Sequence, residues 1–301
     1  MHCPICERDT QGTIRDSGWF SHFLCVSCGT EVLAESRGEP AYPDDYFGNE
    51  EEKFRGAAGG IRRHWHETRA SRLRGIVGEG SRRLYDIGCG DGLFLKAASG
   101  HGFSIGGLEP MEKAREQAHR KLGCGIDREP FTSSPEGGFD AVTAWQVIEH
   151  LENPGELFDS VYRNLRSGGI FAVSTVNLES WQARLFGSNW LHLDPPRHLW
   201  VGKRRQVEKL LQKHGFKIVA RRWNHLEFGP VGYVDSFVNL FDSKRDRILK
   251  CLKTGFPGVA NKISWAIAAV LTPAAVLFSA IEAALGVPAT FELYATKVAP
   301  R

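Results

Sequence analysis

The chain has 301 residues, of which 42% are hydrophobic and 24% are charged, and its formal net charge is +3. This composition is typical of a soluble globular protein with one large domain and appendages, or with two domains. Arginine and lysine pairs are scattered along the sequence and form no concentrated basic stripe, which argues against a dedicated nucleic-acid-binding protein.

Two cysteine pairs stand at the start of the chain, where residues 1–30 lack the apolar segment of a secretory signal. Cys3 and Cys6 form one C-x2-C pair, and Cys25 and Cys28 form the other. This spacing is typical of zinc sites, and four thiolates leave no open position for catalysis. We therefore expect a zinc-ribbon-like module with a structural Zn²⁺ over residues 1–35.

The seven cysteines are an odd number, and Cys89, Cys124 and Cys251 lie far apart in the sequence. Unpaired thiols are typical of a reducing compartment, so we expect a cytoplasmic protein without a disulfide scaffold.

A linker with an N-terminal helix is expected over 36–80, followed by the main domain over 81–301. Apolar runs there alternate with amphipathic segments, a pattern typical of a doubly wound α/β sheet. The predicted strands are 84–87, 104–109, 124–128, 139–145, 169–176, 216–223 and 290–297, and the predicted helices include 61–77, 93–99, 111–122, 154–165 and 203–214.

A glycine-rich turn follows the first predicted strand, with Gly88, Gly90 and Gly92. Glycines allow a sharp turn and a close approach of ligand to backbone. The next helix presents unpaired N–H groups and a positive dipole end. Open α/β sheets bind ligands at the carboxyl ends of their strands, so this turn is the predicted cofactor site.

The pattern excludes the dinucleotide fingerprint, because G-x-G-x-x-G would need glycine where the chain has Leu93. Asp86, before the turn, could orient the amino end of a methionine moiety directly or through water. Glu109, at the end of the second strand, offers two acceptor oxygens for ribose hydroxyls.

With these residues in this order, residues 83–222 resemble the class I S-adenosylmethionine-dependent methyltransferases, which have a Rossmann-like, seven-stranded sheet. The segment from Ile148 to Leu151, followed by Asn153 and Pro154, is similar to the ubiquinone-type O-methyltransferases. A generic Rossmann-like domain with another ligand is the alternative. The resemblance implies cofactor contacts at Asp86, Gly88, Cys89, Gly90, Glu109, Pro110, Gln146 and Val147.

Methyl transfer from a sulfonium depends mainly on positioning, but a hydroxyl acceptor also needs a base. His150 follows the fourth strand and is the first candidate for a base or acceptor contact, or else it fixes the loop structurally. His198 is the second candidate, in an aromatic-rich stretch over 181–200. That stretch fits either a planar acceptor or a lid packed on the sheet edge.

An apolar segment over 263–285 contains Pro273 and Glu282. A single membrane crossing would separate the last two strands of one sheet, so we expect a hairpin of two short helices, 259–271 and 274–286. This hairpin could cover the active site, form a homodimer interface or contact a membrane surface.

The sequence thus predicts methyl transfer to a small-molecule acceptor, most readily at oxygen. An RNA methyltransferase that uses the zinc module for RNA recognition is the first alternative, and a non-catalytic cofactor-binding scaffold is the second. The zinc module itself fits a substrate-side cap or an RNA-recognition element, both by fold-level analogy alone.

Overall fold

The computed structural model describes residues 2–9, 11–16, 20–36, 57–80, 82–129, 138–223, 225–241, 248–249 and 259–298. Residues 37–56 of the expected linker, and Cys251, lie outside these residues. The chain divides into two compact units, which we call the cysteine unit and the sheet unit. The cysteine unit comprises Met1–Gly59, Val176–Val207 and Trp223–Phe291, and the sheet unit comprises Gly60–Thr175, Glu208–Arg222 and Glu292–Arg301.

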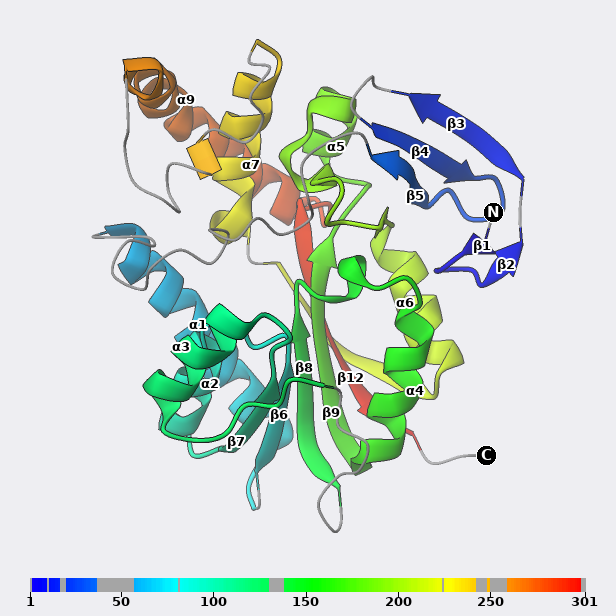
Figure 1. Ribbon diagram of the computed structural model, residues 1–301, viewed down its shortest axis with the longest axis vertical. Coiled ribbons are helices and arrows are strands. Elements are labelled where there is room, and N and C mark those ends of the chain that lie inside the picture. Colours follow the sequence, from blue (N-terminus) through cyan, green and yellow to red (C-terminus); the bar gives the residue numbers. More distant parts are fainter. Residues whose placement is uncertain are drawn as a thin grey trace. The chain divides into compact units, whose positions relative to one another are not determined.

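A mixed six-stranded sheet with the order β11-β12-β9-β8-β6-β7 is the frame of the sheet unit (Figure 1). β6 pairs in parallel with β7 and β8, and β8 with β9, whereas β11 and β12 are antiparallel. This pairing confirms the predicted α/β sheet. The strands are β6 (Arg83–Ile87), β7 (Ser104–Leu108), β8 (Phe139–Trp145), β9 (Leu165–Val176), β11 (Phe216–Arg222) and β12 (Thr290–Lys297).

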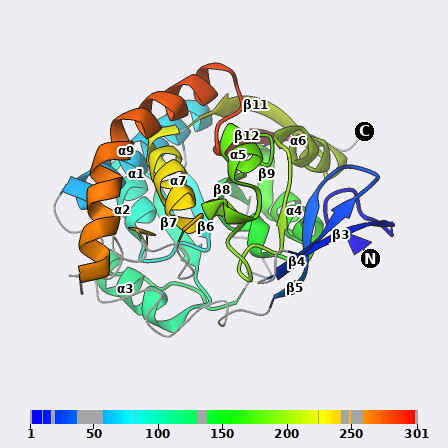
Figure 2. The ribbon, with the colours of Figure 1, turned by 90° about the horizontal axis from the view of Figure 1, so that it is seen from above.

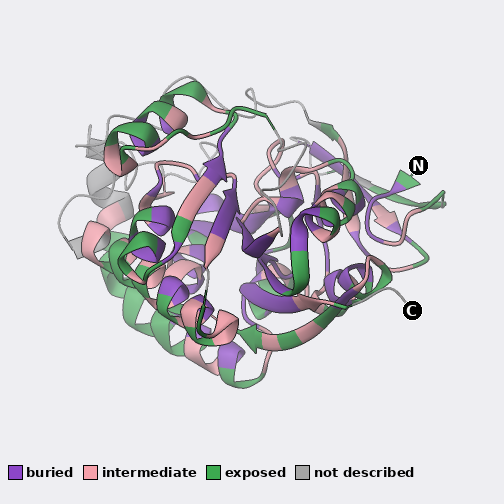
Figure 3. Ribbon diagram, turned by 90° about the horizontal axis from the view of Figure 1, so that it is seen from below, coloured by how far each residue is buried: buried purple, intermediate pink, exposed green. Residues whose placement is uncertain are grey.

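Helices cover both faces of this sheet. In Figure 1, α1, α2 and α3 lie on one face and α4 on the other. β8 is buried from Phe139 to Ala144 and β9 from Gly169 to Val176, because both faces of these strands are covered. Figure 3 shows buried strands at the centre of the molecule. The helices are α1 (Ala57–Val77), α2 (Leu93–Gly100), α3 (Glu112–Leu122) and α4 (Pro154–Asn164).

Residues 124–128 do not form the predicted strand. Only an isolated parallel bridge between Leu108 and Asp127 forms there, so the described sheet has six strands instead of seven. Asp127 donates its N–H to the Gly107 carbonyl at 2.8 Å and accepts from the Glu109 N–H at 2.9 Å. One bridge satisfies these groups, and the neighbouring Gly125 disfavours a longer ladder.

The cysteine unit contains a two-stranded sheet and a four-stranded antiparallel sheet with the order β10-β5-β4-β3. A distant part of the chain, Trp200–Val201, supplies β10. This pairing was not predicted, because no local sequence pattern links residues so far apart in the chain. The other strands are β1 (His2–Cys3), β2 (Arg8–Asp9), β3 (Gly12–Asp16), β4 (Phe20–Cys25) and β5 (Glu31–Ser36).

The helices of the cysteine unit include α5 (Trp181–Phe186), α7 (His225–Asn239) and α9 (Val259–Ala284). α7 and α9 pack side by side, as both Figure 1 and Figure 2 show. Gly229 makes this contact close, because a Cβ there would lie 2.6 Å from the Ser279 Oγ. The buried core of the unit includes Phe20, Val176, Trp190, Leu193, Val201, Tyr233, Val234, Ala268 and Ala275.

The expected hairpin of helices 259–271 and 274–286 is wrong. One helix, α9, runs through Pro273 and pairs with α7. Proline removes one helical hydrogen bond and crowds the preceding turn, at a cost of about 3 kcal/mol. The buried contact with α7 offsets this cost. Local sequence could not reveal that contact, because α7 was itself not predicted.

Glu282 interrupts the apolar sequence of α9 for a structural reason. Its carboxylate is buried and accepts the Gln182 backbone N–H at 3.1 Å. Gln182 lies in the first turn of α5, where N–H groups have no helical partner. The Ser180 hydroxyl satisfies another of these groups by accepting the Ala183 N–H. Glu282 therefore joins α9 to the start of α5.

Candidate functional site

The glycine-rich turn joins β6 to α2 in a conformation that requires glycine. Gly88, Gly90 and Gly92 have φ angles of 68°, 57° and 77°. A Cβ on Gly88 would lie 2.7 Å from the Val147 Cγ2. The turn and the residue after β8, predicted separately as cofactor contacts, therefore lie against each other.

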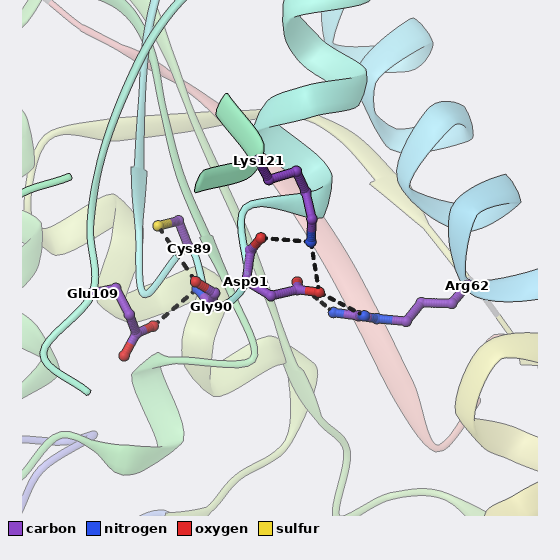
Figure 4. Close-up of polar contacts among 6 residues, drawn as sticks. All are labelled: Arg62, Cys89, Gly90, Asp91, Glu109 and Lys121. Atoms are coloured by element: carbon purple, nitrogen blue, oxygen red, sulfur yellow. Dashed lines mark hydrogen bonds and ion pairs between the residues drawn. The ribbon is translucent and has the colours of Figure 1, made fainter. Parts of the chain in front are cut away.

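Glu109 stands at the end of β7 and is anchored by backbone groups on both carboxylate oxygens. Oε2 accepts the Gly90 N–H at 2.9 Å (Figure 4), and Oε1 accepts the Met111 N–H at 2.9 Å. Burial raises its pKa, whereas these two N–H groups lower it. Each carboxylate oxygen has a second lone pair, so the fixed carboxylate can still accept two hydroxyl donors.

Asp86 is a buried carboxylate at the end of β6. Its Oδ1 accepts the Thr143 hydroxyl at 2.5 Å. Burial raises the pKa of Asp86 to about 8. The hydrogen bond from Thr143 lowers this pKa, whereas the nearby charge of Glu109 raises it further. A cation placed beside this group would favour its charged form. The position therefore suits an ammonium or sulfonium ligand.

Gln146 directly follows β8 with φ 54°, a left-handed conformation that is uncommon for residues other than glycine. Its backbone N–H donates to the Ser174 carbonyl at 3.1 Å and to the Ser174 Oγ at the same distance. Backbone strain of this kind clusters at ligand sites. Ser174 was not foreseen as a site residue, because its role depends on pairing between β8 and β9.

Asp91, Arg62 and Lys121 form a latch, a cluster of ion pairs on the turn that no sequence motif predicted (Figure 4). Arg62, on α1, donates to both carboxylate oxygens of Asp91, at 2.7 and 3.0 Å. Lys121, on α3, lies 3.0 Å from Asp91 Oδ2 and donates to the Asp91 carbonyl at 2.8 Å. Burial alone would raise the pKa of Asp91, but the two cations hold it well below its usual range.

A buried ion-pair network fixes α1 to β12 on the same unit. Arg69 donates to the Glu292 Oε1 at 2.7 Å, and Arg72 donates to Oε2 at 2.8 Å. The Arg69 guanidinium also lies 5.1 Å from the ring centroid of Trp145, at the end of β8. Both charges of Arg69–Glu292 are nearly inaccessible to water, so losing one partner would leave the other unpaired.

The two candidate bases lie in different units. His150 ends the short helical turn Ile148–His150 of the sheet unit, is half-buried and donates its backbone N–H to the Val147 carbonyl at 3.0 Å. His198 is buried in the cysteine unit, with its Nδ1 2.8 Å from the His192 carbonyl and its Nε2 3.9 Å from Asp194 Oδ2. A carbonyl only accepts, so the Nδ1 of His198 carries the proton.

The four N-terminal cysteines gather as predicted. Their sulfurs all lie within 4.8 Å of one another, with Cys3–Cys28 at 3.6 Å and Cys6–Cys25 at 3.8 Å. Tetrahedral ligands about 2.3 Å from a zinc ion would be about 3.8 Å apart, whereas a disulfide would need about 2.05 Å. Tight turns shape each pair, since Glu7 donates its N–H to the Cys3 carbonyl and Gly29 to the Cys25 carbonyl.

The comparisons with known proteins bear on the sheet unit and its turn. A family model described as a methyltransferase domain matches residues 60–221, which is more than half of the chain. The chain belongs to this family. Its fold, with Asp86 and Glu109 beside the glycine-rich turn, is the class I S-adenosylmethionine-dependent methyltransferase fold.

Curated relatives of this chain include ubiquinone biosynthesis O-methyltransferases. The Thiobacillus denitrificans enzyme is 30% identical over 125 residues, which are 39% of this chain and 51% of that protein. The Cupriavidus pinatubonensis enzyme is 27% identical over 191 residues, 56% of this chain and 75% of that protein. The chain spans about half the length of the first of these relatives.

Solved structures support the fold alone. A sarcosine dimethylglycine methyltransferase from Galdieria sulphuraria has a TM-score of 0.52 at 12% identity, covering 80% of this chain and 87% of that one. Geranyl diphosphate methyltransferase has a TM-score of 0.51 at 14% identity, covering 87% and 93%. Their differing names illustrate that this fold does not specify the methyl acceptor.

Proposed function

We propose that the protein transfers a methyl group from S-adenosylmethionine to an oxygen of a small molecule. The observation that carries this proposal is the glycine-rich turn flanked by two buried carboxylates, Asp86 and Glu109. The ubiquinone-type relatives support an oxygen acceptor, and the scattered basic residues do not favour RNA.

Each carboxylate has a distinct role in holding the cofactor. Glu109, fixed by the N–H groups of Gly90 and Met111, would accept the ribose hydroxyls. Asp86 would hold the methionine ammonium, directly or through water. Gly90, whose missing side chain leaves open space beside the turn, would let the nucleoside approach the backbone. When bound, the cofactor supplies the electrophilic methyl group and a neutral leaving group, so orientation and exclusion of water provide much of the rate.

The acceptor hydroxyl must lose its proton, and His150 is the proposed base. It ends the helical turn that follows β8, four residues after the strained Gln146, at the carboxyl end of the parallel strands where this architecture binds ligands. His198 is the second proposed base, since its Nδ1 proton leaves Nε2 as the acceptor when the ring is neutral.

The proposal is tested by calorimetry with S-adenosylmethionine and by mass spectrometry of cell metabolites incubated with deuteriomethyl-labelled cofactor. We expect wild-type protein to bind the cofactor and Glu109→Ala to bind at least about tenfold more weakly, because two charge-assisted hydrogen bonds are lost. Glu112→Ala, which changes an exposed glutamate at the start of α3, is the matched control. Wild-type protein that binds no cofactor would reject the methyltransferase assignment, and labelled RNA in place of a labelled metabolite would favour the RNA alternative.

We also propose that Cys3, Cys6, Cys25 and Cys28 bind a structural Zn²⁺. The sulfur spacing fits a tetrahedral site of four thiolates, the donor set that zinc favours. The two-stranded sheet of β1 and β2, which carries Cys3, is too short to bury much apolar surface, so metal binding would supply much of the energy that folds this part of the chain.

Finally, we propose that the exposed face of α9 contacts a lipid surface from the cytoplasmic side. Trp265–Ala284 is long and apolar enough to cross a membrane, with mean hydropathy 1.9, but only 28% of it is buried. Its exposed apolar residues include Ile267, Val270, Val276, Leu277 and Phe278. The preceding sequence contains Lys244, Arg245, Arg247, Lys250 and Lys253. An apolar face beside basic sequence favours an anionic membrane surface over a dimer or a cap.

A further inference from the structure

The cysteine module is not an isolated appendage, because its sheet includes a strand from the middle of the chain. β10 lies at the edge of β5, with Trp200 opposite Val32 and Val201 opposite Glu31. The Leu33 N–H also donates to the Leu199 carbonyl at 2.8 Å. The module therefore offers the template on which residues 199–201 become ordered.

A second link starts from one of the cysteine turns. The Gln206 side-chain Nε2 donates to the Cys28 carbonyl, and its Oε1 accepts the Lys203 N–H at 2.6 Å. Gln206 thus joins the turn of the second cysteine pair to the start of the helix Arg204–Lys213. Just before this helix, the Gly202 carbonyl accepts the Leu178 N–H at 2.9 Å. Both ends of the segment 178–202 are therefore held in the cysteine unit.

This segment carries His192 and His198, which contact each other through the His192 carbonyl. Its buried side chains Trp190, Leu193 and Val201 share one core with Phe20 of β4, and Leu33 of β5 packs against that core. Residues of the module thus form part of the packing that fixes the conformation of both histidines.

We propose that metal at the four cysteines orders the segment 190–202, which makes these cysteines positioning residues for the acceptor side of the reaction. This inference rests on the proposed function, because it assumes zinc at the cysteines and a role for the segment. It explains why a metal module that leaves no open coordination position stands in a small-molecule enzyme. The module acts through the β5–β10 pairing and through Gln206.

The test uses the full chain, with zinc content measured by mass spectrometry and backbone order measured by hydrogen exchange. Removing zinc with a chelator is expected to accelerate exchange over 199–202 and 31–34 on the order of tenfold or more, because local opening no longer costs the metal-binding free energy. Restoring zinc should reverse the change. Exchange in β6–β9 and cofactor binding should stay within about twofold, because the sheet unit has its own core.

Gln206→Ala tests the link without touching a ligand. We expect it to retain zinc and to exchange faster over 199–202, whereas Arg205→Ala, an exposed neighbour on the same helix, should match the wild type. If metal removal unfolds the whole chain, the Gln206→Ala variant provides the test instead. Hydrogen exchange over 199–202 that is equal in Gln206→Ala and Arg205→Ala would overturn the inference.

Two other outcomes separate the inference from the function on which it rests. If hydrogen exchange over 190–202 is unchanged after complete loss of zinc, the coupling between the metal and this segment is rejected, but the zinc site itself is not. Protein that neither contains nor takes up zinc would reject the zinc site and the coupling together, while cofactor binding would still support methyl transfer.

Discussion

The buried carboxylate of Asp86 lowers the stability of the cofactor-free protein. Its raised pKa means that the folded protein keeps this proton up to about pH 8, whereas an unfolded chain releases it near pH 3.8. The group therefore destabilises the fold progressively as the pH rises between these two values. A bound ammonium group would offset this cost, which is one reason to keep a carboxylate in such a buried position.

Asp86→Asn should therefore stabilise the cofactor-free protein and weaken cofactor binding. Asparagine keeps an acceptor for the Thr143 hydroxyl but has no charge to desolvate, so we expect a gain of about 1–3 kcal/mol at pH 8. The gain should shrink as the pH falls towards 4. Urea unfolding across this pH range measures it, and a gain that does not depend on pH would contradict the titration of Asp86.

At the scale of elements, α1 and the glycine-rich turn depend on each other through the Arg62–Asp91 latch. Arg62→Met should lower cofactor affinity by about three- to tenfold and accelerate hydrogen exchange in α1, because a partly buried, bidentate ion pair is lost. The remaining Lys121 contact limits the loss. Arg63→Met, an exposed neighbour on α1, is the control. Equal affinities of the two variants would show that the latch does not shape the site.

Elements with their own local pattern were predicted well. The strands β6, β7, β8, β11 and β12 and the helices α2, α3 and α4 agree with their predicted ranges to within about two residues. Each combines an apolar run with glycine or proline at its ends. α7 was missed because Gly229, Pro230 and Gly232 oppose helix formation locally, and packing on α9 overrides this preference.

At the scale of the molecule, α9 presents a row of exposed apolar side chains among the residues that the structure describes. Val270 and Leu277 lie seven residues apart on α9, on one helix face, and are 77% and 59% exposed. Replacing both with glutamate should abolish binding to vesicles that contain anionic phosphatidylglycerol. The control variant carries Ile14→Glu and Val219→Glu, which add equal charge at other exposed apolar positions. We expect wild-type and control protein to sediment with the vesicles.

Sedimentation velocity distinguishes the competing roles of this face. A dimer that dissociates in the α9 variant, with no vesicle binding by the wild type, would overturn the membrane proposal in favour of a homodimer interface. Loss of methyl transfer in the α9 variant, again without vesicle binding, would favour a cover for the active site.

The α/β fold, the glycine-rich turn with Asp86 and Glu109, and the four-cysteine cluster could all be predicted from the sequence alone. These features rest on local spacing, because turns, strand ends and C-x2-C pairs are short-range patterns. The Arg62–Asp91 latch, the β5–β10 pairing and the uninterrupted α9 became visible only in the folded chain. These features depend on contacts between residues far apart in the chain, where packing and ion pairing outweigh local preference.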